Sequence, residues 1–160
     1  VIVSDLSPAR LAQSSVFGAD IAIQGDLEGR AIKEAVMDTS NGRGADIVVE
    51  AVGREETIGQ AIDVTGIRGN VVFFGLPDTR KDIAFNYWKF FMKQIQMYGV
   101  VNAQAEADMS SFHKALDWIA RREIDVTKMV SHRLPLESIG QALTLAHERD
   151  EDALKVTLTF

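Results

Sequence analysis

The chain has 160 residues, no cysteine, a formal net charge of -6, and 46% hydrophobic residues. This length suits one domain, or one and a fraction, with a substantial buried core. The acidic balance argues against nucleic acid or an anionic membrane as partner, and the missing cysteines exclude disulfides and Cys-ligated zinc within the chain. No apolar run approaches the ~20 residues that span a bilayer and no secretory signal is visible, so we expect a cytoplasmic protein.

Residues 1–5 predict a buried strand with an acid, Asp5, at its end. No methionine precedes this strand, so we expect the chain to be a piece of a longer protein. Asp5 has two interpretations. At the end of the second strand of a Rossmann unit, a carboxylate accepts hydrogen bonds from both adenosine ribose hydroxyls and would repel the 2′-phosphate of NADP. Alternatively, Asp5 or Ser7 caps the helix that Pro8 begins.

That helix is expected to end at Gly18, since glycine is a common helix C-cap. A short strand over residues 19–23 follows, and the order strand, helix, strand is typical of a βαβ unit. Residues 28–39 carry apolar side chains at helical spacing and predict an amphipathic helix.

Residues 45–53 form the segment around which we expect the fold to be organised. Their apolar, β-branched run predicts a parallel strand buried on both faces. Ligands bind outside the carboxyl ends of such strands, where small residues let a flat ring approach the backbone. We therefore expect a nucleotide-cofactor site whose floor includes Val52 and Gly53.

A second buried strand is predicted over residues 71–75, after a helix over residues 57–64 and a turn over residues 66–70. This strand also ends in a glycine, Gly75. Two parallel strands that end in small residues at one edge would form opposing lips of a crevice, which favours the cofactor interpretation.

Residues 85–92 are rich in aromatic side chains, which suit either a stacking platform for bases or a helix in the core or at a subunit contact. Few basic residues lie nearby, so we favour the helix. Residues 94–101 alternate polar and apolar side chains and predict a half-exposed edge strand. Such an edge strand can pair with the same strand of a second subunit, so we expect a homo-oligomer.

The last third predicts a helix from Asp108 or Ser110 to about Arg122, an extended link over 130–135, a helix over 136–146 and a final strand over 155–160. The first helix would bury a stripe formed by Phe112, Ala115, Leu116 and Ile119. The three histidines lack ligand spacing, and we identify no metal site and no catalytic residue in the chain.

Several segments, taken in order, resemble the medium-chain, zinc-type alcohol dehydrogenase family, and they cover essentially the whole chain. They are residues 1–5, 17–20, 42–53, 69 with 74–77, and 131–139. The resemblance implies an α/β fold: an incomplete Rossmann-type, doubly wound parallel sheet without its first strand and Gly-rich loop, plus a C-terminal helical and strand segment. Residues 1–103 would be the truncated NAD-binding domain, and residues 104–160 would pack on the catalytic domain.

The resemblance also implies roles for single residues. Asp5 would hold the adenosine ribose with Arg10 beside it, and Lys155 would lie near the pyrophosphate. The expected cofactor-binding residues are Asp5, Arg10, Val52, Gly53, Gly75, Leu76, Pro77 and Val100.

The implied activity is that of an NAD-dependent alcohol or polyol dehydrogenase that acts on a small alcohol or carbonyl substrate. Its zinc ligands and its pyrophosphate loop would lie outside this chain, so we expect the chain alone to be inactive. Two alternatives stay open: a zinc-free quinone or enoyl reductase of the same superfamily, and a non-catalytic nucleotide-binding or oligomerisation module.

Overall fold

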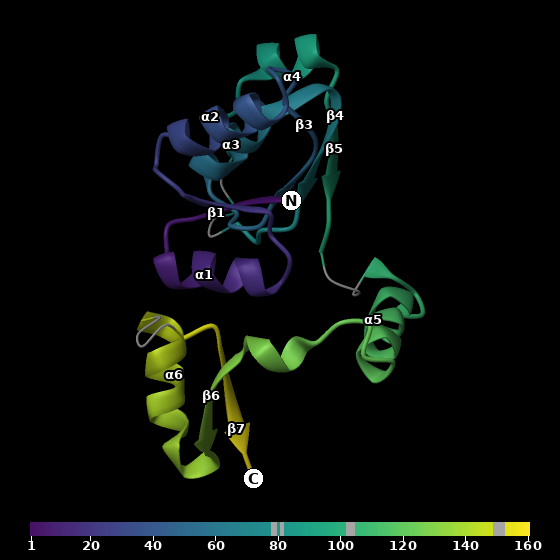
Figure 1. Cartoon of the computed structure of the whole chain (residues 1–160). Coiled ribbons are helices and arrows are strands. Elements are labelled where there is room, and N and C mark those ends of the chain that lie inside the picture. The colour runs from purple at the N-terminus through teal and green to yellow at the C-terminus, as the bar shows by residue number, and fades with distance from the viewer. Residues whose placement is uncertain (78–79, 81, 102–104, 149–152) are drawn as a thin grey trace. The chain divides into compact units, whose positions relative to one another are not determined.

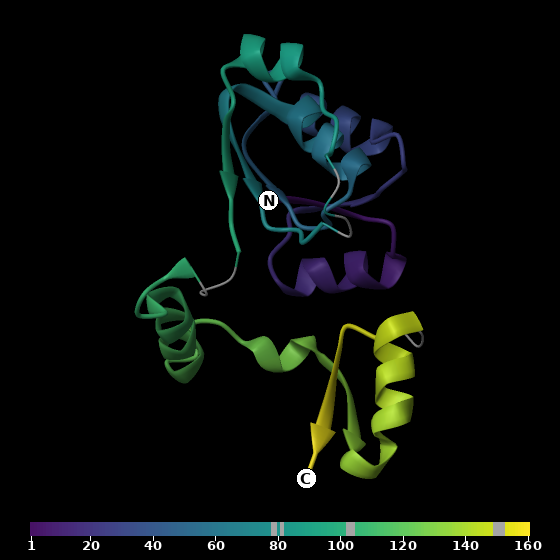
Figure 2. The same cartoon turned by 180° about the vertical axis from the view of Figure 1, so that it is seen from behind.

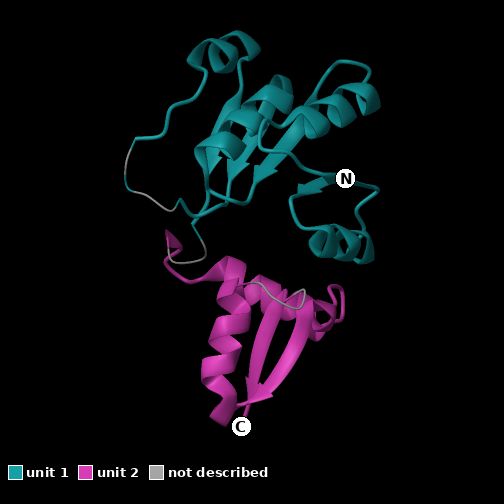
Figure 3. Cartoon of the chain, turned by 90° about the vertical axis from the view of Figure 1, so that its left-hand side faces the viewer, with its two compact units in different colours: residues 1–102 teal, residues 103–160 magenta. Residues whose placement is uncertain are grey.

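A computed structural model of the chain describes all residues except 78–79, 81, 102–104 and 149–152. Its contacts divide the chain into two compact units, residues 1–102 and residues 103–160 (Figure 3). In both units, parallel strands are connected by helices (Figure 1). The predicted α/β class is confirmed.

The first unit alternates strands and helices along the chain. Its elements are β1 (Ile2–Asp5), α1 (Pro8–Val16), β2 (Ile21–Gln24), α2 (Arg30–Thr39), β3 (Ala45–Glu50), α3 (Glu55–Val64), β4 (Thr65–Phe73), α4 (Tyr87–Lys93) and β5 (Gln96–Gly99). The start and the end of α1 follow from its sequence. Ser7 caps it by accepting a hydrogen bond from the Arg10 amide at 3.4 Å, Pro8 opens its first turn, and Gly18 follows its end with φ of +91°.

The strands of this unit form two separate parallel sheets among the described residues. One contains β1 and β2, and the other has the order β3-β4-β5. In a doubly wound sheet the first strand would lie between the strands that are here β1 and β3. The expectation that these two strands are not neighbours is confirmed, and each lies at the edge of its own sheet.

Helix α3 covers one face of the β3-β4-β5 sheet and builds the core there. Ala61 and Ile62 of α3 pack against Val71 of β4 and Ile95, with Val48, Phe73, Phe90 and Met97 around them. On the opposite face, Ile47 and Val49 of β3 are 66% and 60% exposed. The prediction of a strand buried on both faces is therefore wrong, because the helices of the described residues leave Ile47 and Val49 of β3 exposed.

The glycine-rich turn predicted over residues 66–70 lies inside β4 as an irregularity of the strand. The pairing register shifts here, since Ala45 lies opposite Thr65 whereas Ile47 lies opposite Asn70. Arg68 has φ of +60°, and a Cβ at Gly66 would lie 2.5 Å from the Arg43 carbonyl oxygen. The close approach of the β3 and β4 backbones accommodates the extra residues of β4 without ending that strand.

Strand β5 is an edge strand, as predicted, and lies at the side of its sheet in both views (Figures 1 and 2). The aromatic segment before it forms α4, which Asn86 caps by accepting from the Lys89 amide. The core prediction holds for Phe90 alone, because the other large apolar residues here are exposed: Phe85, Tyr87, Trp88, Phe91 and Met92.

The second unit contains α5 (Ser110–Ala120), β6 (Val130–Pro135), α6 (Ile139–Glu148) and β7 (Lys155–Thr159), with short 3-10 turns over Val126–Met129 and Leu136–Ser138. Two predictions need correction. The segment expected to be an extended link is β6, which pairs in parallel with β7 after α6 has brought the chain back. The apolar stripe of α5 is not buried in this chain, because α5 packs closely on no other described element.

Candidate functional site

The carboxyl ends of β3 and β4 meet at one edge of the sheet. The Glu50 carbonyl accepts hydrogen bonds from the amides of Phe74 (2.8 Å) and Gly75 (2.9 Å), which follow β4. At the next strand, the Val100 amide donates to the Phe73 carbonyl at 2.9 Å. The structure therefore brings the segments 52–53 and 75–77 and residue Val100 to the same edge, where ligands bind in open α/β sheets.

Two turns touch here through their backbones. The Val52-Gly53 turn follows β3, and the Gly75-Pro77 turn follows β4. A Cβ at Gly75 would lie 2.3 Å from the Gly53 nitrogen, and a Cβ at Gly53 would lie 2.4 Å from the Leu76 carbonyl oxygen. The turns form one continuous wall, whereas the sequence analysis expected two lips with a gap between them. Glycine at positions 53 and 75 permits this close approach, because glycine has no Cβ atom.

Glu50 is the residue of this edge that the sequence analysis missed. Its side chain is 4% exposed, and its Oε1 accepts from the Val52 amide, the Gly53 amide and the Thr57 hydroxyl, each at 2.8 Å. No donor among the described residues reaches its buried Oε2. A buried polar atom without a partner costs about 1–3 kcal/mol. The signal in the sequence was an acid at the end of an apolar strand, just before small residues.

Asp5, the last residue of β1, and Arg10 of α1 lie side by side. Asp5 Oδ1 accepts from the Ser7 amide at 2.8 Å, and Asp5 Oδ2 lies 3.9 Å from Arg10 Nη1. Both side chains are about one-third exposed. In the described structure, Asp5 thus shapes the turn into α1 and Ser7 is the helix cap, while Arg10 faces the carboxylate. Asp5 ends β1 and Arg10 lies on α1, which connects β1 to β2, whereas the other six predicted cofactor residues follow strands of the β3-β4-β5 sheet.

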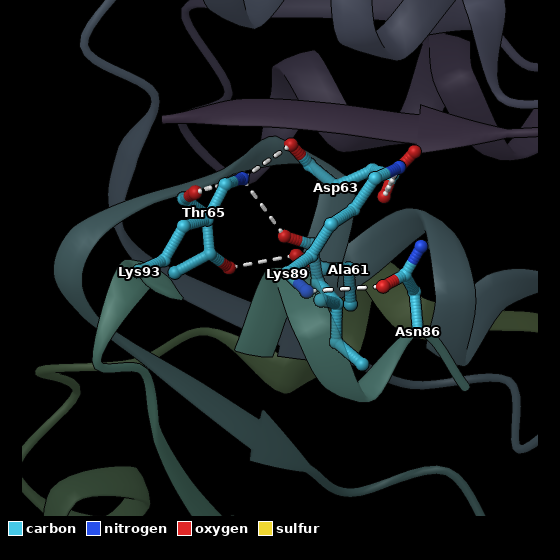
Figure 4. Close-up of polar contacts among 7 residues, drawn as sticks. Ala61, Asp63, Thr65, Asn86, Lys89 and Lys93 are labelled. Atoms are coloured by element: carbon cyan, nitrogen blue, oxygen red, sulfur yellow. Dashed lines mark hydrogen bonds and ion pairs between the residues drawn. The ribbon is translucent and has the colours of Figure 1, made fainter. Parts of the chain in front are cut away.

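A polar cluster ties α4 to the end of α3 (Figure 4). Lys93 Nζ donates to the carbonyl oxygens of Ile62, Asp63 and Thr65 at 3.1, 2.9 and 2.7 Å, and Lys89 Nζ lies 2.5 Å from Asp63 Oδ1. Burial lowers the pKa of Lys93 despite the nearby Asp63 carboxylate. The ammonium group satisfies the Ile62 and Asp63 carbonyls, which lie in the last turn of α3, and the Thr65 carbonyl at the start of β4, so this cluster is structural.

A cavity of about 450 Å³ lies beside the same cluster, and none of the eight predicted cofactor residues lines it. Its charged lining residues are Glu28, Arg30, Lys33, Glu56, Asp63 and Lys89. Three of these side chains are acidic and three are basic, so their charges indicate no preference for an anion or a cation.

The remaining titratable residues of interest belong to other elements of the chain. His113 is on α5, His132 on β6 and His147 on α6, and the described residues contain no group of three or more side chains able to hold a metal ion. Lys155 opens β7 in the second unit. Glu55 and Glu56 form the exposed first turn of α3. Within the described part of the chain, no helix has the length and apolar character needed to span a membrane.

The sequence profile of a family described as Zinc-binding dehydrogenase matches residues 1–121. The chain belongs to the zinc-binding dehydrogenase family. It is 30% identical to a sorbitol dehydrogenase of Halalkalibacterium halodurans over 161 residues, a match that covers 99% of this chain and 44% of the relative.

Two solved structures of alcohol dehydrogenases share the fold. An alcohol dehydrogenase of Thermotoga maritima is 30% identical with a TM-score of 0.78, over 99% of this chain and 42% of that protein. A short chain alcohol dehydrogenase of E. coli CFT073, complexed with its cofactor NADH, has a TM-score of 0.81 at 19% identity, over 100% of this chain and 44% of that protein. The chain thus spans less than half the length of these relatives.

Proposed function

We propose that the chain is the cofactor-binding part of an NAD-dependent, zinc-type dehydrogenase of the cytoplasm that oxidises small alcohols or polyols. The observation that carries this proposal is the wall formed by the Val52-Gly53 and Gly75-Pro77 turns at the carboxyl edge of a parallel sheet. This is where dinucleotides bind in doubly wound folds. The sorbitol dehydrogenase relative supports the polyol substrate class.

The residues of the chain fit NAD. When bound, the nicotinamide ring supplies the hydride acceptor and donor. The exposed apolar side chains of Val52 and Leu76 would contact the cofactor beside the two turns, and Val100 would extend this surface. Asp5 would accept hydrogen bonds from the adenosine ribose, with Arg10 orienting its carboxylate, and would disfavour a 2′-phosphate.

The residues of the chain do not fit a catalytic zinc ion. The chain contains no cysteine, and no group of three or more metal-ligating side chains occurs in the described residues. The zinc implied by the family would therefore be held by residues outside this chain. By the same argument, we expect this chain alone to catalyse no turnover.

The test is an assay of the full-length protein with NAD⁺ and a panel of polyols and primary alcohols, following NADH formation. We expect turnover of at least one substrate, its loss on treatment with a zinc chelator, and no turnover by residues 1–160 alone. A full-length protein that reduces quinones or enoyl compounds in a chelator-insensitive reaction would refute the zinc-type assignment. Failure to use any nicotinamide cofactor would favour a non-catalytic module.

We also propose that the parent protein is a homo-oligomer that pairs through β5. The strand lies at a sheet edge and exposes Tyr98. An unpaired edge with an exposed aromatic side chain is suited to pairing with a second chain. Light scattering of the full-length protein should give a mass of at least two chains, and a monomer at all concentrations would contradict this.

A further inference from the structure

We propose that Glu50 is a positioning residue that gives the nucleotide-binding wall its shape. The inference deepens the proposed function and rests on it. Glu50 is bonded through its side chain to one turn of the wall and through its main chain to the other. It is not a catalytic residue, since we assign it no contact with substrate or cofactor.

The side-chain half of this arrangement fixes the Val52-Gly53 turn. Oε1 accepts from the two consecutive amides, and both bonds are 2.8 Å long. Hydrogen bonds to a carboxylate are stronger than those to a neutral acceptor. The two N–H groups are thereby directed toward Glu50, while the Val52 side chain stays 54% exposed. The exposed side of the turn thus presents carbon atoms, which suits the flat apolar face of a ring.

Thr57 extends the same arrangement into α3. Its hydroxyl lies 2.8 Å from Glu50 Oε1 and 3.0 Å from the Arg54 carbonyl, and it accepts from the Arg54 amide at 3.3 Å. The carboxylate therefore links the turn to the first turn of a helix that packs on the core. A turn anchored to a core helix holds its shape before a ligand arrives, which lowers the ordering cost of binding.

The main-chain half fixes the second turn against the first. The Glu50 carbonyl accepts from the Phe74 and Gly75 amides, and Gly75 then lies against the backbone of Val52 and Gly53. A shift of the Val52-Gly53 turn would therefore displace Gly75 as well. One side chain thus controls the shape of both segments that the proposed function assigns to the cofactor.

Two variants weaken or remove these hydrogen bonds and keep the size of the side chain. Glu50→Gln keeps the length of the side chain but replaces a charged acceptor by a neutral one, and Thr57→Val removes the hydroxyl while keeping the shape. In the full-length protein we expect each to raise the dissociation constant for NADH by about 5–10-fold, a change of about 1–1.4 kcal/mol. The Michaelis constant for NAD⁺ should rise by a similar factor and that for the alcohol by less than about twofold.

Two matched variants serve as controls. Glu55→Gln removes the same charge from the exposed first turn of α3, and Thr57→Ser keeps the hydroxyl. Both should bind NADH as the wild type does. Melting temperatures of all four variants identify any loss of folding, and Thr57→Val supplies the result if Glu50→Gln does not fold.

The outcomes separate the inference from the function on which it rests. A wild type that binds no NADH overturns the proposed function, and this inference with it. Folded Glu50→Gln and Thr57→Val proteins that bind NADH as tightly as the wild type overturn the inference alone, because Glu50 would then stabilise the fold without shaping the site. Equal rises in the Michaelis constants for NAD⁺ and alcohol would also contradict it.

Discussion

Gly75 illustrates how one missing side chain permits the contact on which the site depends. The position where its Cβ would lie is 2.3 Å from the Gly53 nitrogen and 2.5 Å from the Val52 nitrogen. Both neighbours are backbone atoms whose positions are fixed by hydrogen bonds to Glu50. An alanine here would separate the two turns.

We therefore expect Gly75→Ala to lower the free energy of unfolding by at least about 2 kcal/mol, because overpacking against backbone cannot relax easily. Gly59→Ala, in α3 with nothing within 4 Å of its Cβ position, should raise it by about 0.5–1 kcal/mol. Urea unfolding of both variants measures this difference. Equal effects of the two substitutions would show that the turns are not in contact.

Asp26 caps α2 with both carboxylate oxygens. The Ala31 amide donates to Oδ2 at 2.8 Å and the Arg30 amide to Oδ1 at 3.0 Å, and these bonds lower the pKa of Asp26 below its ordinary value of 3.8. A depressed pKa in the folded state stabilises the fold at pH above the ordinary value, and this contribution is lost as the pH falls through the folded value.

Asp26→Asn keeps an acceptor at this cap but does not titrate. We expect the wild type to melt at a higher temperature than the variant at about pH 6, and the difference to shrink as the pH falls below the ordinary pKa of 3.8 and through the lower folded-state pKa. Thermal melts of both proteins across this range test the prediction. A difference that does not change with pH would contradict the role of the carboxylate charge.

At the scale of elements, α4 is held to α3 mainly by Lys93. The variant Lys93→Met removes three hydrogen bonds to carbonyl oxygens. We expect it to cost about 1.5–3 kcal/mol of stability, the range for bonds from a charged donor. Lys89→Met breaks only the partly exposed ion pair with Asp63 and should cost less than about 1 kcal/mol. A larger loss for Lys89→Met in chemical unfolding would contradict this order.

Local patterns predicted most helices and strands of this chain, because their causes are local. Ser7, Pro8 and Gly18 set the limits of α1 through capping, and the apolar runs identified β3 and β4. The errors involve partners that are distant in sequence. The exposure of Ile47 and Val49 depends on what packs on the sheet. The irregularity of β4 depends on its register with β3, and the pairing of β6 depends on the later strand β7.

The candidate site was predictable in part for the same reason. Small residues after two apolar strands indicated where Val52, Gly53 and Gly75 would meet. The structural role of Glu50 was not predictable, since its hydrogen bonds form only when the chain after β3 folds back on the carboxylate. Its charge within an apolar strand was the visible sign.

At the scale of the whole molecule, the two sheets of the first unit carry different parts of the proposed cofactor site. The β1-β2 sheet and its connecting helix α1 carry Asp5 and Arg10, for the adenosine end, and the β3-β4-β5 sheet carries the wall formed by the two turns. In a doubly wound fold a further strand would lie between them. We therefore expect tight NAD binding by the full-length protein and not by this chain alone.

The most direct test of the account is a calorimetric titration of the full-length protein with NADH and, separately, with NADPH. The Asp5 carboxylate and the wall at the ends of β3 and β4 predict that NADH binds at least about tenfold more tightly, a difference of about 1.4 kcal/mol. Absence of binding by either nucleotide, or tighter binding of NADPH, would contradict the account.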